Sequence, residues 1–295
     1  MPKIWTHILF CEDILDTIIG PHPFSQNETF IKLGAQGPDL FLYYNFWPWS
    51  TNKEHIHAIS NFLHTERCGN FIVDLIKAAK DKNEKVRSYV FGFITHHLLD
   101  RNTHPYIYHL AQALHHEPQE LEVKIDTLMM ERFHRLKTWK APAYKEIDIG
   151  FRMNKDIASL LHDLIKKYNQ KIRGQNAAYI HKSYRDMKLA LRLFSDPYGW
   201  KNKLFPSYVS LYSHQPVNDH IDYLNLQKTT WYHPVTKKPS LESFIDLYEN
   251  ARAEGLEIIT EVLNYWHSEN AFVPKKLLQL IGNKSYQTGM SLPKK

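Results

Sequence analysis

The chain has 295 residues, of which 43% are hydrophobic and 23% charged, with 15 prolines and 11 glycines. This balance is typical of a globular protein and excludes intrinsic disorder and collagen-like structure. The formal charge of +6 favours anionic partners such as a phosphate group. Because the basic residues are spread along the chain without a dense block, nucleic acid is a possible but not a favoured partner.

No stretch of the sequence approaches the roughly 18 uninterrupted apolar residues that a membrane helix needs, so we expect no integral membrane segment. The first residues also lack the apolar core of a secretory signal, because Met1–His7 is soon followed by Glu12 and Asp13. The two cysteines, Cys11 and Cys68, indicate no disulfide framework. We therefore expect a cytoplasmic protein.

Apolar residues recur mostly at spacings of three and four, which predicts helices along the chain. In chain order, the predicted helices are 4–18, closed by Gly20-Pro21, then 71–79, 86–99, 121–133 with Pro118 in its first turn, 155–168, 176–194 and 240–266. The predicted loops are 21–28, 45–53, 137–151, 196–207 and 231–240, followed by a polar, frayed tail at 285–295. Alternating strand patterns are scarce, so the sequence predicts an all-α fold.

Histidine is the residue type in excess, with 18 in the chain and 12 of these within the first 134 residues. Imidazole is the commonest metal ligand in proteins. We therefore predict a single all-α domain spanning 1–295, in which residues 1–135 carry metal ligands. Residues 136–295 supply further helices and loops that complete the fold.

The strongest local signal is the run from Thr95 to Pro105. On a helix, His96 and Asp100 are four residues apart and lie on one face, so both can reach one metal ion. His104 follows four residues later. His97, three residues before Asp100, is an alternative to His96, and the alternative reading of the whole run is a half-buried helix end.

Other candidate ligands are dispersed along the first half of the chain. Asp39 follows Gly37-Pro38 in a tight turn, and Glu122 lies on a predicted helix just after His116. His7 and His64 are lone histidines on apolar helices, each of which alone is as readily a core residue. Taken together, their order along the chain alternates imidazoles and carboxylates, which are ligands suited to zinc.

At these residues the sequence resembles the zinc-dependent phospholipase C family, which is related to zinc-dependent single-strand nucleases. The resemblance runs over about the first 135 residues. It is carried by Trp5-Thr6-His7, Gly34-Ala35-Gln36-Gly37-Pro38-Asp39, His64, the run from His96 to His104-Pro105, and Leu121-Glu122-Val123 with Ile125-Asp126. The remainder resembles the intracellular branch of the family found in bacilli.

The resemblance implies a multi-helix phospholipase C/nuclease-like bundle with a metal cleft, extended by C-terminal helices. It implies one zinc site of Asp39, His64, His96 and Asp100, a second of His104, His116 and Glu122, and a third of His7 with Asp100. Glu120 is the alternative to Glu122, because it stands four residues after His116. In secreted relatives, an N-terminal tryptophan completes the third site. Here four residues precede Trp5, which puts the third site in doubt, so we expect two or three zinc ions.

The resemblance also implies hydrolysis of a phosphodiester, such as a phospholipid head group, by water that zinc has activated. Asp100 would bridge the metals, and Asp39 would be both a ligand and the residue that orients the nucleophile. The aromatic segment 41–49 would either line the cleft or pack in the core. The alternative functions are a nuclease or phosphomonoesterase on the same site, and a metal-binding scaffold without turnover.

Overall fold

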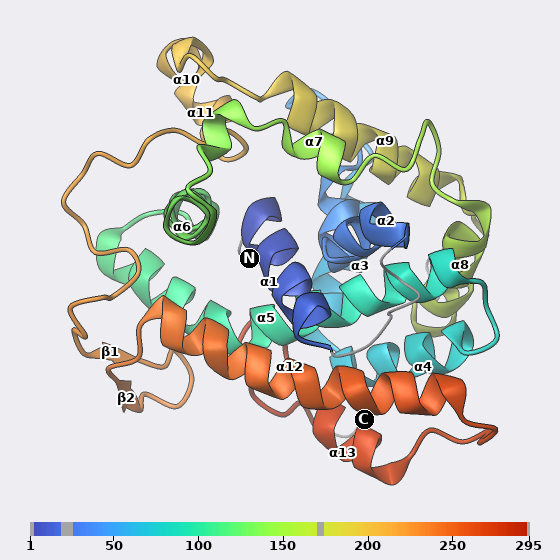
Figure 1. Ribbon diagram of the computed structural model, residues 1–295. Coiled ribbons are helices and arrows are strands. Elements are labelled where there is room, and N and C mark those ends of the chain that lie inside the picture. Colours follow the sequence, from blue (N-terminus) through green and yellow to red (C-terminus); the bar gives the residue numbers. More distant parts are fainter. Residues whose placement is uncertain (1–2, 19–25, 170–173, 294–295) are drawn as a thin grey trace.

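The computed structural model describes residues 3–18, 26–169 and 174–293, and helices make up most of this part of the chain (Figure 1). The longer helices are α1 (Ile4–Thr17), α2 (Glu28–Gly34), α3 (Glu54–Thr65), α4 (Cys68–Ala79), α5 (Glu84–Leu114), α6 (Pro118–His134), α8 (Lys155–Tyr168), α9 (Ala178–Leu193), α12 (Phe244–His267) and α13 (Lys275–Ile281). The shorter elements are η2 (Gly37–Tyr43), η3 (Thr138–Lys140), α7 (Ala143–Glu146), α10 (Trp200–Leu204), α11 (Pro206–Val209) and the antiparallel strands β1 (Trp231–Tyr232) and β2 (Pro239–Ser240). The predicted all-α fold is confirmed.

Helix α5 runs through the core, with α12 packed alongside it (Figure 1). Its first turn is capped by the side chain of Asn83, which accepts a hydrogen bond from the Val86 amide. Helix α2 crosses α5 where Gly92 meets the backbone of α2, and a Cβ atom added to Gly92 would lie 2.0 Å from the Ile31 carbonyl oxygen. Only glycine permits this approach. The crossing brings the segment that follows α2 against the middle of α5.

The predicted end of this central helix at residue 99 is wrong, because α5 continues to Leu114 with Pro105 inside it. Pro105 has no amide hydrogen to donate to the Arg101 carbonyl oxygen, which normally breaks a helix. Here Pro105 is buried and the next turn buries Tyr106 and Ile107, so tertiary packing favours continuation. Gly289 of the C-terminal tail packs against the Arg101 carbonyl, where an added Cβ would lie 2.4 Å from the oxygen.

The predicted frayed tail is also wrong over its described residues, 285–293. The Tyr286 side chain is fully buried, and its amide donates a hydrogen bond of 3.1 Å to the His64 carbonyl oxygen. The tail turns back on itself through a bridge between Lys284 and Ser291. The sequence of this tail is polar, but its one large aromatic residue anchors it to α3.

The other predicted helices form, and 155–168 has the predicted ends while the ends of the rest are shifted. Helix α1 ends at Thr17, and the predicted stop at Gly20-Pro21 lies outside the described residues. The predicted loops 137–151 and 196–207 contain the short helices η3, α7, α10 and α11, and 231–240 forms the β1–β2 hairpin. Helix α3 was predicted as the apolar helix that carries His64, but without bounds. Helices α2 and α13 were not predicted, and each has only seven residues, which is short for a periodic signal.

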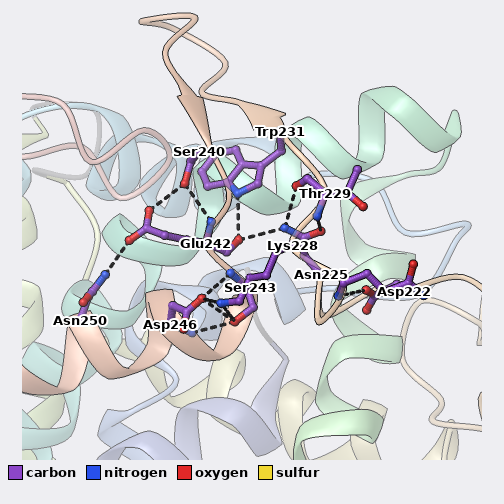
Figure 2. A network of polar contacts seen from close by, with 11 residues as sticks. Asp222, Asn225, Lys228, Thr229, Trp231, Ser240, Glu242, Ser243, Asp246 and Asn250 are labelled. Atoms are coloured by element: carbon purple, nitrogen blue, oxygen red, sulfur yellow. Dashed lines mark hydrogen bonds and ion pairs between the residues drawn. The ribbon is translucent and has the colours of Figure 1, made fainter.

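A polar network fixes the long connection before α12 (Figure 2). Ser243 and Asp246 form a capping box at the first turn of α12. The Asn225 side-chain amide donates to the carbonyl oxygens of Thr229 and Glu242 at 2.9 and 3.1 Å. These bonds tie a segment with little regular structure to itself and to the start of α12.

Candidate metal centre

The centre of the candidate site is Asp100, a fully buried carboxylate in the middle of α5. The helix places His96 one turn before it and His104 one turn after it. The Nε2 atom of His96 lies 3.1 Å from Asp100 Oδ2, and the Nε2 atom of His104 lies 3.3 Å from Asp100 Oδ1. Because α5 continues through Pro105, all three side chains share one helical face.

Two further helices bring histidines to the same carboxylate, and η2 brings a second carboxylate beside one of these histidines. From α1, the His7 Nε2 atom lies 3.4 Å from Asp100 Oδ1, and from α3, the His64 Nε2 atom lies 3.7 Å from Asp100 Oδ2. Asp39, in the first turn of η2, has its Oδ1 atom 3.5 Å from His64 Nε2. Two groups have donor atoms close enough to share one ion: His7 with His96 and Asp100, and Asp39 with His64 and His96.

Backbone carbonyls orient two of these imidazole rings. The Nδ1 atom of His96 lies 2.9 Å from the Ala35 carbonyl oxygen, and the Nδ1 atom of His64 lies 2.7 Å from the Ser60 carbonyl oxygen. A ring that donates its Nδ1 hydrogen in this way turns a bare Nε2 toward the cluster. A hydrogen bond from the other ring nitrogen to a carbonyl oxygen is characteristic of metal-ligating histidines.

The cluster leaves many buried polar atoms without a hydrogen bond among the described residues. These atoms are Nε2 of His7, His64, His96 and His104, both carboxylate oxygens of Asp100, and Oδ1 of Asp39. Their pairs are close, but none is aligned as a hydrogen bond. Because buried polar atoms are almost always satisfied, a cation among them would account for the arrangement, and a donor set of imidazole nitrogen and carboxylate oxygen suits zinc.

The charges of the cluster also suit a metal ion. Burial alone would raise the pKa of Asp100, but His104 and His96 hold that pKa well below its usual range. Burial lowers the pKa of His104 to about 3 and also lowers the pKa of His7. An ionised Asp100 is the form that binds a metal ion, and the same carboxylate raises the pKa of His96 against the effect of burial, so a bound cation would take the place of a proton at that imidazole.

Gly37 makes the close packing around His96 possible. It has a φ of +49°, and a Cβ atom added to it would lie 2.4 Å from His96 Cδ2. Asp39 follows two residues later, so the turn that admits the His96 ring also delivers the Asp39 carboxylate.

We predict that Gly37→Ala displaces the His96 ring and weakens zinc binding. The strain of a left-handed backbone at alanine and the clash of its Cβ atom with the His96 ring should together lower the free energy of unfolding by roughly 2–3 kcal/mol. Gly150→Ala is the matched control, because Gly150 also has a positive φ, +111°, but has no atom within 4 Å of an added Cβ. Zinc affinity and urea unfolding should change much more in the first variant than in the second, and equal effects would contradict the role of the His96 contact.

His97 points away from the cluster. Its Nε2 atom lies 3.0 Å from the Arg101 guanidinium, and its ring meets Tyr286 edge to face with centroids 4.3 Å apart. Arg101 is itself buried and donates to the Ile281 carbonyl oxygen. Of the two alternatives that the sequence left open, His96 is therefore the one that faces Asp100.

A cavity of about 580 Å³ opens beside the cluster. Asp39, His64 and His104 line it, so the candidate ligands form part of its wall. Its other lining residues include Lys3, Leu42, Tyr43, Tyr108, Glu122 and Tyr212. The Lys3 ammonium lies 3.9 Å from Glu122 Oε2, which gives the cavity a positive and a negative group in addition to the cluster.

His116 is not brought to the cluster. Its side chain is exposed, and its Nδ1 atom lies 2.9 Å from Glu120 Oε2. Pro118 begins α6, so His116 precedes the helix and does not share the buried face of Glu122. The seven other predicted ligands are either in the cluster or in the wall of its cavity.

Trp5 is held by a buried carboxylate. The amides of Trp5 and Thr6 donate to the two oxygens of Asp126 at 3.0 Å each, and His214 Nε2 lies 3.2 Å from the same carboxylate. Asp126 on α6 thus satisfies the first amides of α1 and fixes the helix that carries His7. No local spacing predicts a role for His214, because its partner Asp126 is 88 residues away in the chain.

The aromatic segment 41–49 divides between the two predicted roles. Leu42 and Tyr43 line the cavity, whereas Phe46 packs edge to face on Phe194. Trp49 stacks on Trp47 and is largely exposed. Only the first part of the segment therefore contributes to the candidate site.

Residues 6–179 match the protein family described as zinc dependent phospholipase C. The match covers more than half of the chain and includes every residue of the buried cluster. The chain belongs to the zinc-dependent phospholipase C family. The predicted resemblance is confirmed, and the match extends beyond the first 135 residues into α9.

No curated protein and no solved structure matches the chain with significant similarity. Membership of a zinc-dependent family agrees with the two groups of histidine and aspartate side chains that could hold a metal ion. None of the described helices has the length and apolar character needed to cross a membrane.

Proposed function

We propose that the chain is a phospholipase C-like phosphodiester hydrolase that holds two or three zinc ions. The observation that carries the proposal is the buried cluster around Asp100, whose unpaired donor atoms adjoin a cavity large enough for a small phosphodiester. The proposed ligands are His7, Asp39, His64, His96, Asp100 and His104, with Glu122 in the cavity wall. His116 is left out because of its exposed position next to Glu120.

Zinc, when bound, supplies a nucleophilic water at neutral pH and neutralises charge on the phosphate group. Asp100 keeps four histidines from three packed helices, α1, α3 and α5, oriented around one charge. Asp39 retains some exposure to the cavity, with 16% of its side chain accessible, so it can align the attacking water and accept its proton. The Lys3 ammonium attracts the anionic substrate, and Leu42 and Tyr43 offer an apolar wall to its alcohol portion.

The proposal predicts that protein purified without added zinc contains at least two zinc equivalents and hydrolyses a chromogenic phosphodiester. His116→Ala should retain both properties, because its side chain contacts Glu120 rather than the cluster. Mass spectrometry measures the zinc content, and a colorimetric assay measures the hydrolysis of the phosphodiester. Zinc content that stays near zero after zinc addition would defeat the proposal, and bound zinc without any phosphodiester hydrolysis would favour the non-catalytic scaffold.

A further inference from the structure

The segment 195–211 runs between two stacked aromatic rings, one of which lines the cavity of the candidate site. Phe194, at the end of α9, stacks on Tyr212 with ring centroids 4.9 Å apart. Tyr212 and Leu211 line the cavity. The segment contains α10 and α11, which lie at the edge of the bundle (Figure 1). It therefore leaves and rejoins the fold next to the candidate active site.

This segment exposes a cluster of large apolar side chains. Their exposed fractions run from 52% for Trp200 to 89% for Tyr198. The cluster, which we term the aromatic surface, consists of Tyr198, Trp200, Leu204, Phe205 and Tyr208. Single exposed apolar residues are ordinary, but five within eleven positions are typical of an interaction surface.

Polar bonds within the segment fix this outward orientation. The Asp196 carboxylate is buried and accepts hydrogen bonds from the backbone and side-chain amides of Asn202 at 2.8 and 3.0 Å. Asn202 also donates to Ser213 Oγ at 2.8 Å, and Gln215 donates to the Asp196 carbonyl oxygen at 2.8 Å. Because polar groups tie the segment to the fold, its aromatic groups are left facing outward.

The exposed charge of the segment is positive. Asp196 is the single acidic residue between 195 and 211, and it is buried. Lys203 is exposed, and Lys201 donates to the carbonyl oxygens of Leu193 and Ser195 at the end of α9. Amphipathic aromatic rings next to lysine are the composition that favours the boundary between water and lipid.

A line of ring contacts joins a further exposed aromatic residue to the same place. Trp49 is 75% exposed and stacks on Trp47, with centroids 5.1 Å apart. Trp47 stacks on Phe46, which meets Phe194 edge to face at 5.7 Å. Phe194 is the ring from which the segment 195–211 departs. The contacts continue through Tyr212 to Tyr43 in the cavity wall.

We propose that the aromatic surface inserts into the interfacial region of a phospholipid bilayer that contains anionic lipid, which brings the cavity mouth to lipid-borne phosphodiesters. This inference rests on the proposed function, since it supplies the route by which a phospholipid reaches the site. Exposed Trp, Tyr and Phe side chains bury their rings at the acyl boundary, while lysine pairs with anionic head groups. The bilayer is the occupant that fits both the apolar and the basic character.

The test uses the full chain with its metal and two sets of vesicles. One set contains phosphatidylcholine alone, and the other contains phosphatidylcholine with phosphatidylglycerol. The double variant Trp200→Ser/Phe205→Ser should bind the anionic vesicles at least about tenfold more weakly than the wild type in a flotation assay, since each buried ring contributes roughly that factor. Phe272→Ser is the matched control, because Phe272 is 83% exposed and lies in the loop between α12 and α13. Figure 1 shows this loop at the opposite side of the molecule from α10.

Hydrolysis of a water-soluble chromogenic phosphodiester separates docking from catalysis. The double variant should keep this activity and lose activity on vesicle lipid. A wild type that binds neither vesicle set, or equal loss in Phe272→Ser, would overturn the proposal. The proposal would also be overturned if the wild type were a dimer and the double variant a monomer, since the aromatic surface would then contact a second copy of the chain. If vesicle binding follows the expected pattern but no phosphodiester is hydrolysed, the proposed function fails and the docking surface stands.

Discussion

Asp100→Asn is expected to abolish phosphodiester hydrolysis and to remove most of the bound zinc. The substitution keeps the shape of the side chain but removes the charge toward which four histidines converge at 3.1–3.7 Å. Without that charge, the four imidazoles are left with Asp39 as the remaining carboxylate of the cluster, which should hold zinc poorly because most of the charge that balances the metal is lost. We expect kcat/KM to fall roughly a thousandfold or more, which corresponds to about 4 kcal/mol of transition-state stabilisation.

The matched control is Asp186→Asn. Asp186 is another nearly buried carboxylate on a helix, where it accepts hydrogen bonds from the Asn45 amide and Lys182. Its loss should reduce stability but leave zinc content and kcat/KM near those of the wild type. Circular dichroism should find the helical signal of Asp100→Asn largely retained. Retention of two zinc equivalents and more than a tenth of the activity would contradict the central role of Asp100.

The part of the candidate site that could be predicted from the sequence is the part encoded by helical spacing. His96 and Asp100 are four residues apart, so local spacing predicted that both lie on one helical face, whereas His104 lies beyond the predicted helix end at residue 99. His7, Asp39 and His64 come from separate elements, and no local pattern connects them. They were predicted through the family resemblance, and the structure brings each of them within 3.7 Å of a partner in the cluster.

What the sequence missed depends on contacts between distant residues. The choice between His96 and His97 is settled in the fold by Arg101 and Tyr286, which engage His97 from the far side. The continuation of α5 through Pro105 depends on burial, which a rule based on proline alone does not include. Asp126 and His214 form a buried pair across 88 residues. Such pairings leave no trace in spacing or composition.

The C-terminal tail is the clearest case, because its polar composition predicted fraying while one residue determines its structure. Tyr286 is fully buried, and its ring meets His64 and His97 edge to face at 4.9 and 4.3 Å. The same residue donates its amide to the His64 carbonyl oxygen, and Ser285 Oγ lies 3.3 Å from that oxygen. The tail thus fixes α3 at the turn that carries a candidate ligand.

Tyr286→Ala is therefore expected to destabilise the protein and to loosen the metal centre. Removal of a buried aromatic ring should lower the free energy of unfolding by roughly 3–5 kcal/mol. Because the ring packs on His64, zinc affinity should also fall, by about ten- to a hundredfold, as when an outer contact of a metal ligand is lost. Urea unfolding of the zinc-free protein and competition with a chelating dye measure the two effects separately.

Tyr286→Phe distinguishes the ring from the hydroxyl. The Tyr286 hydroxyl is buried and has no hydrogen-bond partner among the described residues, so its removal leaves no other group unsatisfied. We expect Tyr286→Phe to match or exceed the wild type in stability, within about 1 kcal/mol, and to keep its zinc affinity. If the phenylalanine variant were as unstable as the alanine variant, the hydroxyl rather than the ring would anchor the tail. The ring contacts with His64 and His97 predict the opposite order.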